Sequence, residues 1–151
     1  MPTIRLETRV RAPIERCFDL ARDVDVHVYS TAGTTERAVG GVTQGLLELG
    51  DEVTWEAVHF GVRQRLTAKI VVFDRPHCFV DEMMRGAFKS LTHRHEFITI
   101  LGGTLMVDTF MFTSPLGILG HIANILFLSR YMRNFLYARN QYLKQTAESG
   151  E

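Results

Sequence analysis

The sequence predicts an α+β protein in which a curved antiparallel β-sheet of about six or seven strands wraps around a long C-terminal α-helix, with two short helices after the first strand. Residues 3–11 alternate polar and apolar side chains, as a half-buried strand does. From Asp51 to Phe112 the same alternation recurs in several runs that turn residues separate. After Ser114-Pro115 the pattern becomes helical, and a long helix at this point would cover the apolar face of the sheet.

The segment that follows the first strand predicts two short helices and one short strand. Pro13 suits the first turn of a helix, and apolar residues follow it at helical spacing as far as Ala21. A second helix is expected from Val24 to Tyr29. A short strand is expected near residues 36–39, inside a segment that is otherwise rich in turn residues.

The clearest hairpin lies between Asp51 and Phe73. Phe60-Gly61 serves as its two-residue turn, which joins the apolar faces of the two strands. The resulting pairs are His59 with Val62 and Trp55 with Leu66.

Three more strands are expected after this hairpin, at residues 78–84, 88–100 and 104–112. If Gly102-Gly103 forms the last tight turn, Phe97 opposes Asp108 and His95 opposes Phe110. Asp108 then lies diagonally from His95, within reach of its side chain.

The terminal helix is expected to run from Ser114-Pro115 to about Ala147. Its first part, residues 116–128, is apolar nearly all round and contains two glycines, which suit a mobile gate to an interior cavity together with the loop at residues 31–45. The same apolar surface equally suits a dimer contact or peripheral contact with a membrane. Several basic residues of the helix and the strands are expected to face water: Arg63, Arg65, Arg94, Arg130, Arg133, Arg139 and Lys144.

The composition predicts one soluble domain, residues 1–151, with 46% hydrophobic residues to form its core. Seventeen basic residues balance seventeen acidic ones, so no net charge attracts nucleic acid. Cys17 and Cys78 stand alone, which indicates neither a disulfide framework nor a zinc site and favours the cytoplasm. The N-terminus lacks a signal-peptide block, and residues 116–128 are fewer than the ~20 that a membrane-spanning helix needs.

The chain resembles the START/polyketide-cyclase superfamily, whose helix-grip fold is shared with birch-pollen-allergen-like proteins, and it looks most similar to small bacterial domains of that group. The resemblance covers essentially the whole chain and is carried by the segments "LETRVRAPIERCFDLARDVD", "GDEVTWEAVHFGVRQRLTAKI", "FVDEMMRGAFKSLTHRHEF", "GGTLMVDTFMFTSPLG" and "RYMRNFLYARNQYLK". It implies a deep, largely apolar cavity between sheet and helix that holds a hydrophobic small molecule such as a lipid, an isoprenoid or an aromatic polyketide. No cofactor is implied.

His93 and His95 are two residues apart on one strand, so they share a face, and three roles are open to them. They give polarity to a cavity or its ligand, they act as acid and base with Asp108 fixing a tautomer, or they bind a metal ion. The metal role has the least support because the pair supplies two ligands and a zinc site wants three or four. Nothing in the sequence brings His59 near them as a third ligand, and no metal site is predicted.

The residues expected to line the ligand cavity share the inward face of their strands, and Gln64 among them either orients a ligand oxygen or lies in solvent at the open end. They are Trp55, His59, Gln64, Leu66, His93, His95, Phe97, Met106, Asp108 and Phe110.

Three functions are consistent with these observations. The first is non-catalytic binding of a hydrophobic small molecule, and the second is a cyclase or dehydratase that acts on a polyketide-type carbonyl through His93, His95 and Asp108. The third is a protein-interaction domain with a filled interior and no ligand. The sequence does not distinguish between these three functions, and it does not determine the oligomeric state.

Overall fold

The computed structural model describes residues 3–31, 35–59, 61–113 and 121–149. Within these residues the chain forms seven strands and three helices. In chain order they are β1 (Thr3–Val10), α1 (Ile14–Ala21), α2 (Val24–Ser30), β2 (Arg37–Gly41), β3 (Glu52–His59), β4 (Val62–Asp74), β5 (Cys78–Arg85), β6 (Ser90–Ile100), β7 (Gly103–Thr113) and α3 (His121–Glu148).

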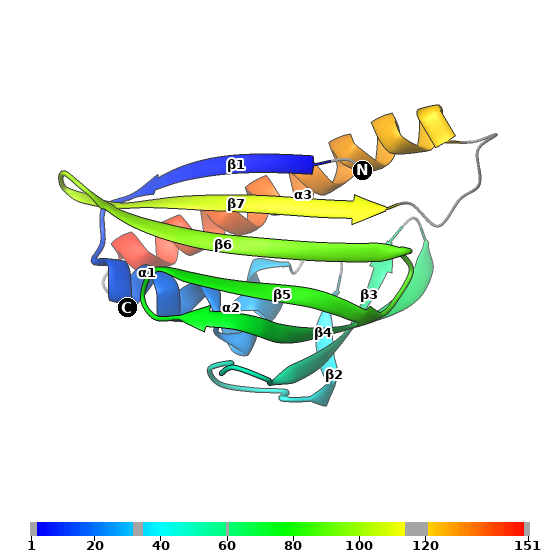
Figure 1. The fold of residues 1–151 in the computed structure, drawn as a ribbon, viewed down its shortest axis with the longest axis horizontal. Coiled ribbons are helices and arrows are strands. Elements are labelled where there is room, and N and C mark those ends of the chain that lie inside the picture. The colour runs from blue at the N-terminus through cyan, green and yellow to red at the C-terminus, as the bar shows by residue number, and fades with distance from the viewer. Residues whose placement is uncertain (1–2, 32–34, 60, 114–120, 150–151) are drawn as a thin grey trace.

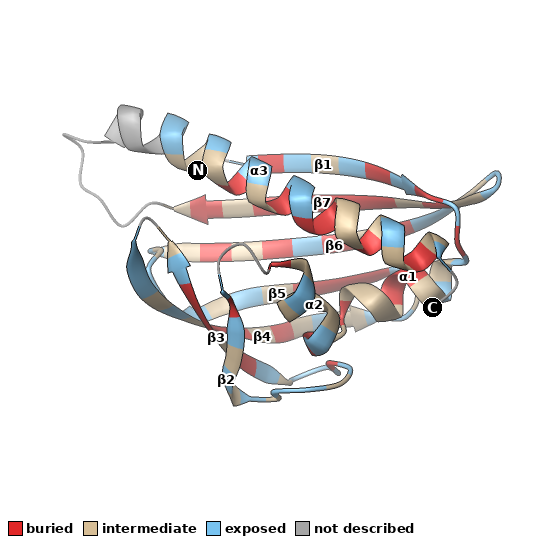
Figure 2. Ribbon diagram, turned by 180° about the vertical axis from the view of Figure 1, so that it is seen from behind, coloured by how far each residue is buried: buried red, intermediate tan, exposed pale blue. Residues whose placement is uncertain are grey.

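The strands form one antiparallel sheet in the order β1-β7-β6-β5-β4-β3-β2. The first strand therefore lies beside the last, and the remaining strands follow as a meander (Figure 1). Figure 2 shows α3 running across one face of this sheet, with α1 and α2 beside its C-terminal part. This architecture confirms the predicted α+β helix-grip fold, including the two short helices after β1.

Two hydrophobic clusters hold α3 against the sheet. One surrounds Phe18 of α1, which is fully buried, and includes Phe97, Met106 and Leu143. The other surrounds Phe112 of β7 and includes residues from the middle of α3, such as Leu136. Burial of a large apolar side chain contributes about 1.5–3 kcal/mol, so these clusters supply much of the energy that closes the helix onto the sheet.

The hairpin of β3 and β4 has the predicted register, with His59 opposite Val62 and Trp55 opposite Leu66. Phe60, the first residue of the predicted turn, lies outside the described residues.

The predicted register between β6 and β7 is wrong by two residues. Ile100 lies opposite Gly103, so Leu101-Gly102 is the turn, and His95 faces Asp108 directly. The two glycines have different roles: Gly102 has a φ of 83°, whereas a Cβ on Gly103 would lie 2.1 Å from the carbonyl oxygen of Val10. Gly103 thus permits the close approach of β1, which local turn patterns do not reveal. Because the shift is two residues, every side chain keeps its predicted face.

Substitution Gly102→Ala is expected to lower the free energy of unfolding by about 1–2 kcal/mol. The reason is the left-handed φ of 83°, since a Cβ there would meet nothing within 4 Å. Urea unfolding checks this prediction. Gly86→Ala is not a suitable control, because its Cβ would lie 2.8 Å from Met83 Sδ. A loss below about 0.5 kcal/mol, which is the usual range for surface variants, would contradict it.

The second part of the predicted terminal helix is confirmed, but one of its residues, Arg139, does not face water as predicted. The expected start at Ser114-Pro115 and two parts of the expected gate, residues 116–120 and 32–34, lie outside the described residues. Arg139 was expected to face water, but it is buried, because a carboxylate on the facing sheet gives it a partner. None of the described helices is both long and apolar enough to cross a membrane.

Candidate functional site: an apolar cavity with a buried histidine cluster

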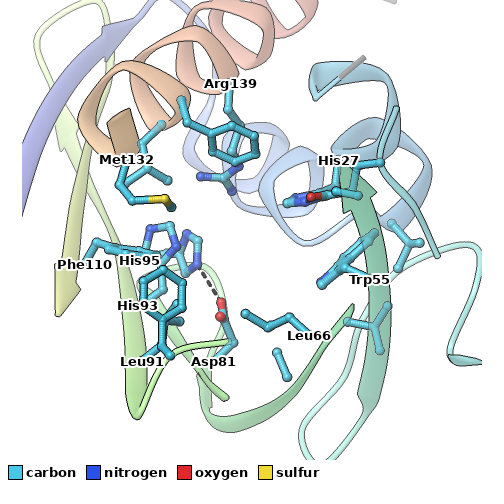
Figure 3. Close-up of a pocket in the computed structure, with 18 of the residues that line it drawn as sticks. His27, Trp55, Leu66, Asp81, Leu91, His93, His95, Phe110, Met132 and Arg139 are labelled. Carbon is cyan, nitrogen blue, oxygen red and sulfur yellow. Dashed lines mark hydrogen bonds and ion pairs between the residues drawn. The ribbon is translucent and has the colours of Figure 1, made fainter. Parts of the chain in front are cut away.

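A cavity of about 180 Å³ lies between the sheet and the helices α2 and α3. About 10–15 Å³ suffices for one water molecule, so there is room for a larger occupant. Its wall is mainly apolar and includes Leu136 and, as Figure 3 shows, Trp55, Leu66, Leu91, Phe110 and Met132.

Most of the residues predicted to line the cavity do so: Trp55, His59, Gln64, Leu66, His93, His95 and Phe110. Three others lie elsewhere. Phe97 and Met106 pack in the core with Leu143 of α3, and Asp108 accepts a hydrogen bond from Asn140 on the same helix. The wall therefore ends where α3 comes down onto the sheet. Whether the lining residues contact a ligand stays a prediction.

Two buried imidazole rings, the buried carboxylate of Asp108 and the half-buried carboxylate of Asp81 form a cluster at one wall of the cavity. His93 Nε2 lies 2.8 Å from Asp108 Oδ1, and His95 Nε2 lies 2.8 Å from Asp81 Oδ2. His95 Nδ1 also lies 3.4 Å from Asp108 Oδ1. The two rings stack with their centroids 3.7 Å apart. We call these four residues, with Arg139, the histidine cluster.

The partners of each ring determine its charge. Both nitrogens of His95 face a carboxylate, and an imidazolium donates to both, whereas a neutral ring would turn a lone pair toward one of them. Burial alone would lower the pKa of His95, but Asp108 and Asp81 raise it above its ordinary value. Burial and the neighbouring charge on His95 lower the pKa of His93 to about 4, although Asp108 opposes them. The contacts of His95 thus favour its imidazolium form, whereas His93 is neutral at pH 7.

Asp108 is the anchor of the cluster. Burial alone would raise the pKa of this carboxyl, but hydrogen bonds from His93 and His95 hold it well below its ordinary value. Its Oδ2 accepts a hydrogen bond of 2.7 Å from Asn140 Nδ2. Arg139 Nη1 lies 3.5 Å from its Oδ1. A carboxylate with so many donors is fixed in place and charged, so it orients the histidines rather than moving protons itself.

Asp81 differs from Asp108 because it lines the cavity. Burial would raise its pKa, but the hydrogen bond from His95 and the nearby charges lower it. Asp81, His93 and Arg139 therefore present polar atoms to the same space (Figure 3).

A second set of polar groups lies on the other side of the cavity. His59 Nδ1 and the hydroxyl of Tyr131 on α3 are 2.6 Å apart, and burial lowers the pKa of His59. The two groups are hydrogen-bonded, and the tautomer of His59 decides which of them donates. Nearby, His27 pairs with Glu36 and stacks on Trp55, with ring centroids 4.1 Å apart. The cavity is thus apolar along its length and polar at two places.

Asp81, His93 and His95 offer one ligand atom each within 4.8 Å of one another, which is the arrangement that a metal ion would use. The sequence analysis found no third ligand to join His93 and His95. In the structure the residue at that position is Asp81, not His59. An ion at this point would replace the proton between His95 and Asp81, beside the guanidinium of Arg139, whose positive charge opposes a second cation. The set fits hydrogen bonding better than metal binding.

Two of the arginines expected to face water, Arg63 and Arg65, belong to an ionic cluster around Glu56 of β3. Arg37 of β2 and Arg65 of β4 bond to Glu56 of β3, and Arg63 lies 3.8 Å from it. Hydrogen bonds from Arg37 and Arg65 lower the pKa of Glu56 to about 2. The cluster links three neighbouring strands.

Sequence reasoning missed Asp81, Arg139 and Tyr131. Asp81 shares the inward face of β5 with Phe79, so a lone carboxylate in that alternation was a readable signal. Arg139 and Tyr131 lie on a helix whose rotation about its own axis depends on the sheet, and helical spacing alone does not indicate which of its polar residues faces inward.

No protein-family model matches the sequence, and no curated protein sequence does either. Solved structures do match over the whole chain. Protein TTHA0849 from Thermus thermophilus is 19% identical with a TM-score of 0.81, and the match covers 99% of each chain. The ginseng major latex-like protein 151 from Panax ginseng is 13% identical with a TM-score of 0.69, over 97% of each chain.

The di-domain ARO/CYC StfQ of the steffimycin biosynthetic pathway is 14% identical with a TM-score of 0.74. The match covers 97% of this chain and 50% of StfQ. Identities this low show a common fold and nothing finer. The chain thus has the same fold as these proteins, which is the helix-grip fold that the sequence predicted.

Proposed function

We propose that the protein binds a hydrophobic small molecule in the cavity between the sheet and α3. The observation that carries this proposal is the cavity itself, about 180 Å³ with an apolar wall and a few buried polar groups that remain open to it. Ligand sites commonly combine an apolar lining with a small number of placed polar groups. The interaction-domain alternative expects a filled interior, and the cavity counts against it.

Native mass spectrometry of the freshly purified protein, followed by denaturing extraction, tests this proposal. We expect a stoichiometric organic compound, or its uptake when the apo protein is incubated with a lipid and polyketide extract. The same spectrum tests the prediction that no metal ion is bound. A protein that stays at its apo mass after incubation would contradict ligand binding.

A pair of variants on β3 ties any bound compound to the cavity. Ala57 lines the cavity, whereas its neighbour Val58 points to solvent. We expect Ala57→Phe to fill the space and abolish the bound mass, and Val58→Phe to leave it unchanged, with both variants folded by circular dichroism. If Ala57→Phe retains the compound, the ligand binds somewhere else.

A cyclase or dehydratase is the second candidate, and one observation favours it. The rings of His95, which has a carboxylate at each nitrogen, and of the neutral His93 stack with centroids 3.7 Å apart at the cavity wall, which places a candidate acid beside a candidate base. Asp108 does not line the cavity, so its part would be to orient both rings. In the His93→Ala/His95→Ala double variant this candidate requires loss of turnover, measured on a poly-β-keto substrate analogue, while binding persists.

A further inference from the structure

The cationic side chain of Arg139 reaches into the cavity from α3. Its residue is only 4% exposed, yet it is one of the residues that line the cavity. Figure 3 shows its guanidinium beside Met132, directed away from the helix and toward the open space. Arginines are almost never fully buried unless they are paired, so the partners of this one matter.

Those partners are few and distant. Arg139 Nη1 lies 3.5 Å from Asp108 Oδ1 and 3.4 Å from Asn140 Oδ1, both at the long limit for a hydrogen bond. A guanidinium has five N–H donors, and these two contacts use one nitrogen. Among the described residues, no side-chain nitrogen or oxygen is both fully buried and without a partner. The other N–H groups of Arg139 are therefore open to the cavity that it lines.

Asp108 cannot be the full partner of Arg139. It already accepts short hydrogen bonds from His93 at 2.8 Å and from Asn140 at 2.7 Å. The other carboxylate of the cluster, Asp81, is bonded to His95 at 2.8 Å. For comparison, Arg37 of β2 approaches Glu56 to 2.7 Å. Arg139 thus keeps most of its donors for a group that enters the cavity.

The geometry points to a hydrophobic carboxylic acid as the ligand class, with its carboxylate bound by Arg139 and its apolar body against Leu66, Phe110 and Met132. This inference rests on the proposed function and narrows it. A carboxylate matches the planar fork of a guanidinium with two parallel hydrogen bonds, which no neutral oxygen can do. The charges of Asp81 and Asp108 repel an anion, but His95 lies between these two carboxylates and offsets one of them.

Trp55 allows a direct test, because it is the single tryptophan of the chain and lines the cavity. Its fluorescence is titrated with decanoic acid and with 1-decanol, which share an apolar chain and differ in the charged group. We expect wild-type protein at pH 7.5 to bind decanoate about tenfold or more tightly than decanol, because the carboxylate makes charge-assisted hydrogen bonds that the hydroxyl does not.

Variants on α3 assign this preference to Arg139. We expect Arg139→Met to weaken decanoate binding about tenfold or more and to leave decanol binding unchanged. Arg139→Lys keeps a positive charge beside Asp108 but loses the planar fork of the guanidinium. We expect this variant to fold and to lose part of the preference for decanoate over decanol. Arg133→Met, at an exposed position on the same helix, is the matched control and should bind both probes as wild type does.

The outcomes separate this inference from the proposed function. Equal binding of both probes by the wild type, or a preference that survives in Arg139→Lys and Arg139→Met alike, overturns the carboxylic-acid inference and leaves the cavity as a neutral-ligand site. If neither probe binds, this inference is overturned, and apo masses after incubation with the extract would overturn the proposed function as well. Extraction of a neutral compound from the purified protein would contradict only the inference.

Discussion

Asp108→Ala is expected to lower the free energy of unfolding by about 3–5 kcal/mol, which is the usual cost of removing one partner from a buried ion pair. The carboxylate is 4% exposed and accepts hydrogen bonds from His93 and Asn140. Without it, His93 and Asn140 would lose their acceptor, and Arg139 would lose its carboxylate partner at 3.5 Å. Urea unfolding followed by circular dichroism gives the measurement.

Two controls keep this prediction specific. Asp74→Ala removes an exposed carboxylate at the end of β4 and should change stability by less than about 0.5 kcal/mol. The double variant Asp108→Ala/Arg139→Met removes the orphaned cation too, and should be more stable than the sum of the two single changes predicts. A loss below about 1 kcal/mol in Asp108→Ala would mean that water replaces the carboxylate.

Stability is expected to fall by about 2 kcal/mol between pH 7 and pH 4.5, because of His93. Burial lowers the pKa of this ring to about 4 from its ordinary value of 6.5. As the pH falls below 6.5, the unfolded chain therefore gains a proton that the folded chain does not take up, and unfolding becomes more favourable. Urea titrations at half-unit intervals of pH measure the slope.

His95 acts with the opposite sign, so the two rings can be distinguished. Its pKa is raised, so its stabilisation is complete below pH 6.5 and is lost as the pH rises through its folded value. His59, whose pKa burial also lowers, adds to the acid effect. We expect His93→Gln to flatten the curve between pH 6.5 and pH 4.5 and to leave the alkaline side unchanged. An acid slope that is the same in His93→Gln and wild type would show that other groups cause it.

The inward face of each strand could be read from the sequence, whereas the position of α3 along that face could not. Alternation placed His93 and His95 on the inner side, and the two-residue error at Gly102-Gly103 did not matter because it preserves the face. Phe97 and Met106 share that face, but they are core because α3 brings Leu143 down onto them. The position at which a helix docks depends on packing over the whole sheet. The alternation pattern of a single strand carries no information about that position.

The burial of charged residues was the second feature that could not be predicted from the sequence. Arg139 reads as a solvated residue of an amphipathic helix, since an isolated helix gives no reason to bury it. It becomes a buried residue because Asp108 of β7 faces it across the interior. Each of these two residues makes sense only with the other, and they are separated by 31 positions in the chain. The cluster around Glu56, in contrast, joins adjacent strands and follows directly from the alternation of β3 and β4.

The pairing of β1 with β7 has a consequence for synthesis on the ribosome. Thr3 pairs with Met111, and Arg16 bonds to the carbonyl oxygen of Ala147. The strand β1 and the helix α1 therefore cannot complete their contacts until β7 and α3 have been synthesised. Until α3 emerges, the apolar face of the meander has no cover, and such surfaces favour aggregation. Contacts this distant also make folding slow for the size of the chain. We therefore expect the nascent protein to depend on chaperones that bind exposed apolar strands, and a ligand already present to be enclosed as the helix closes.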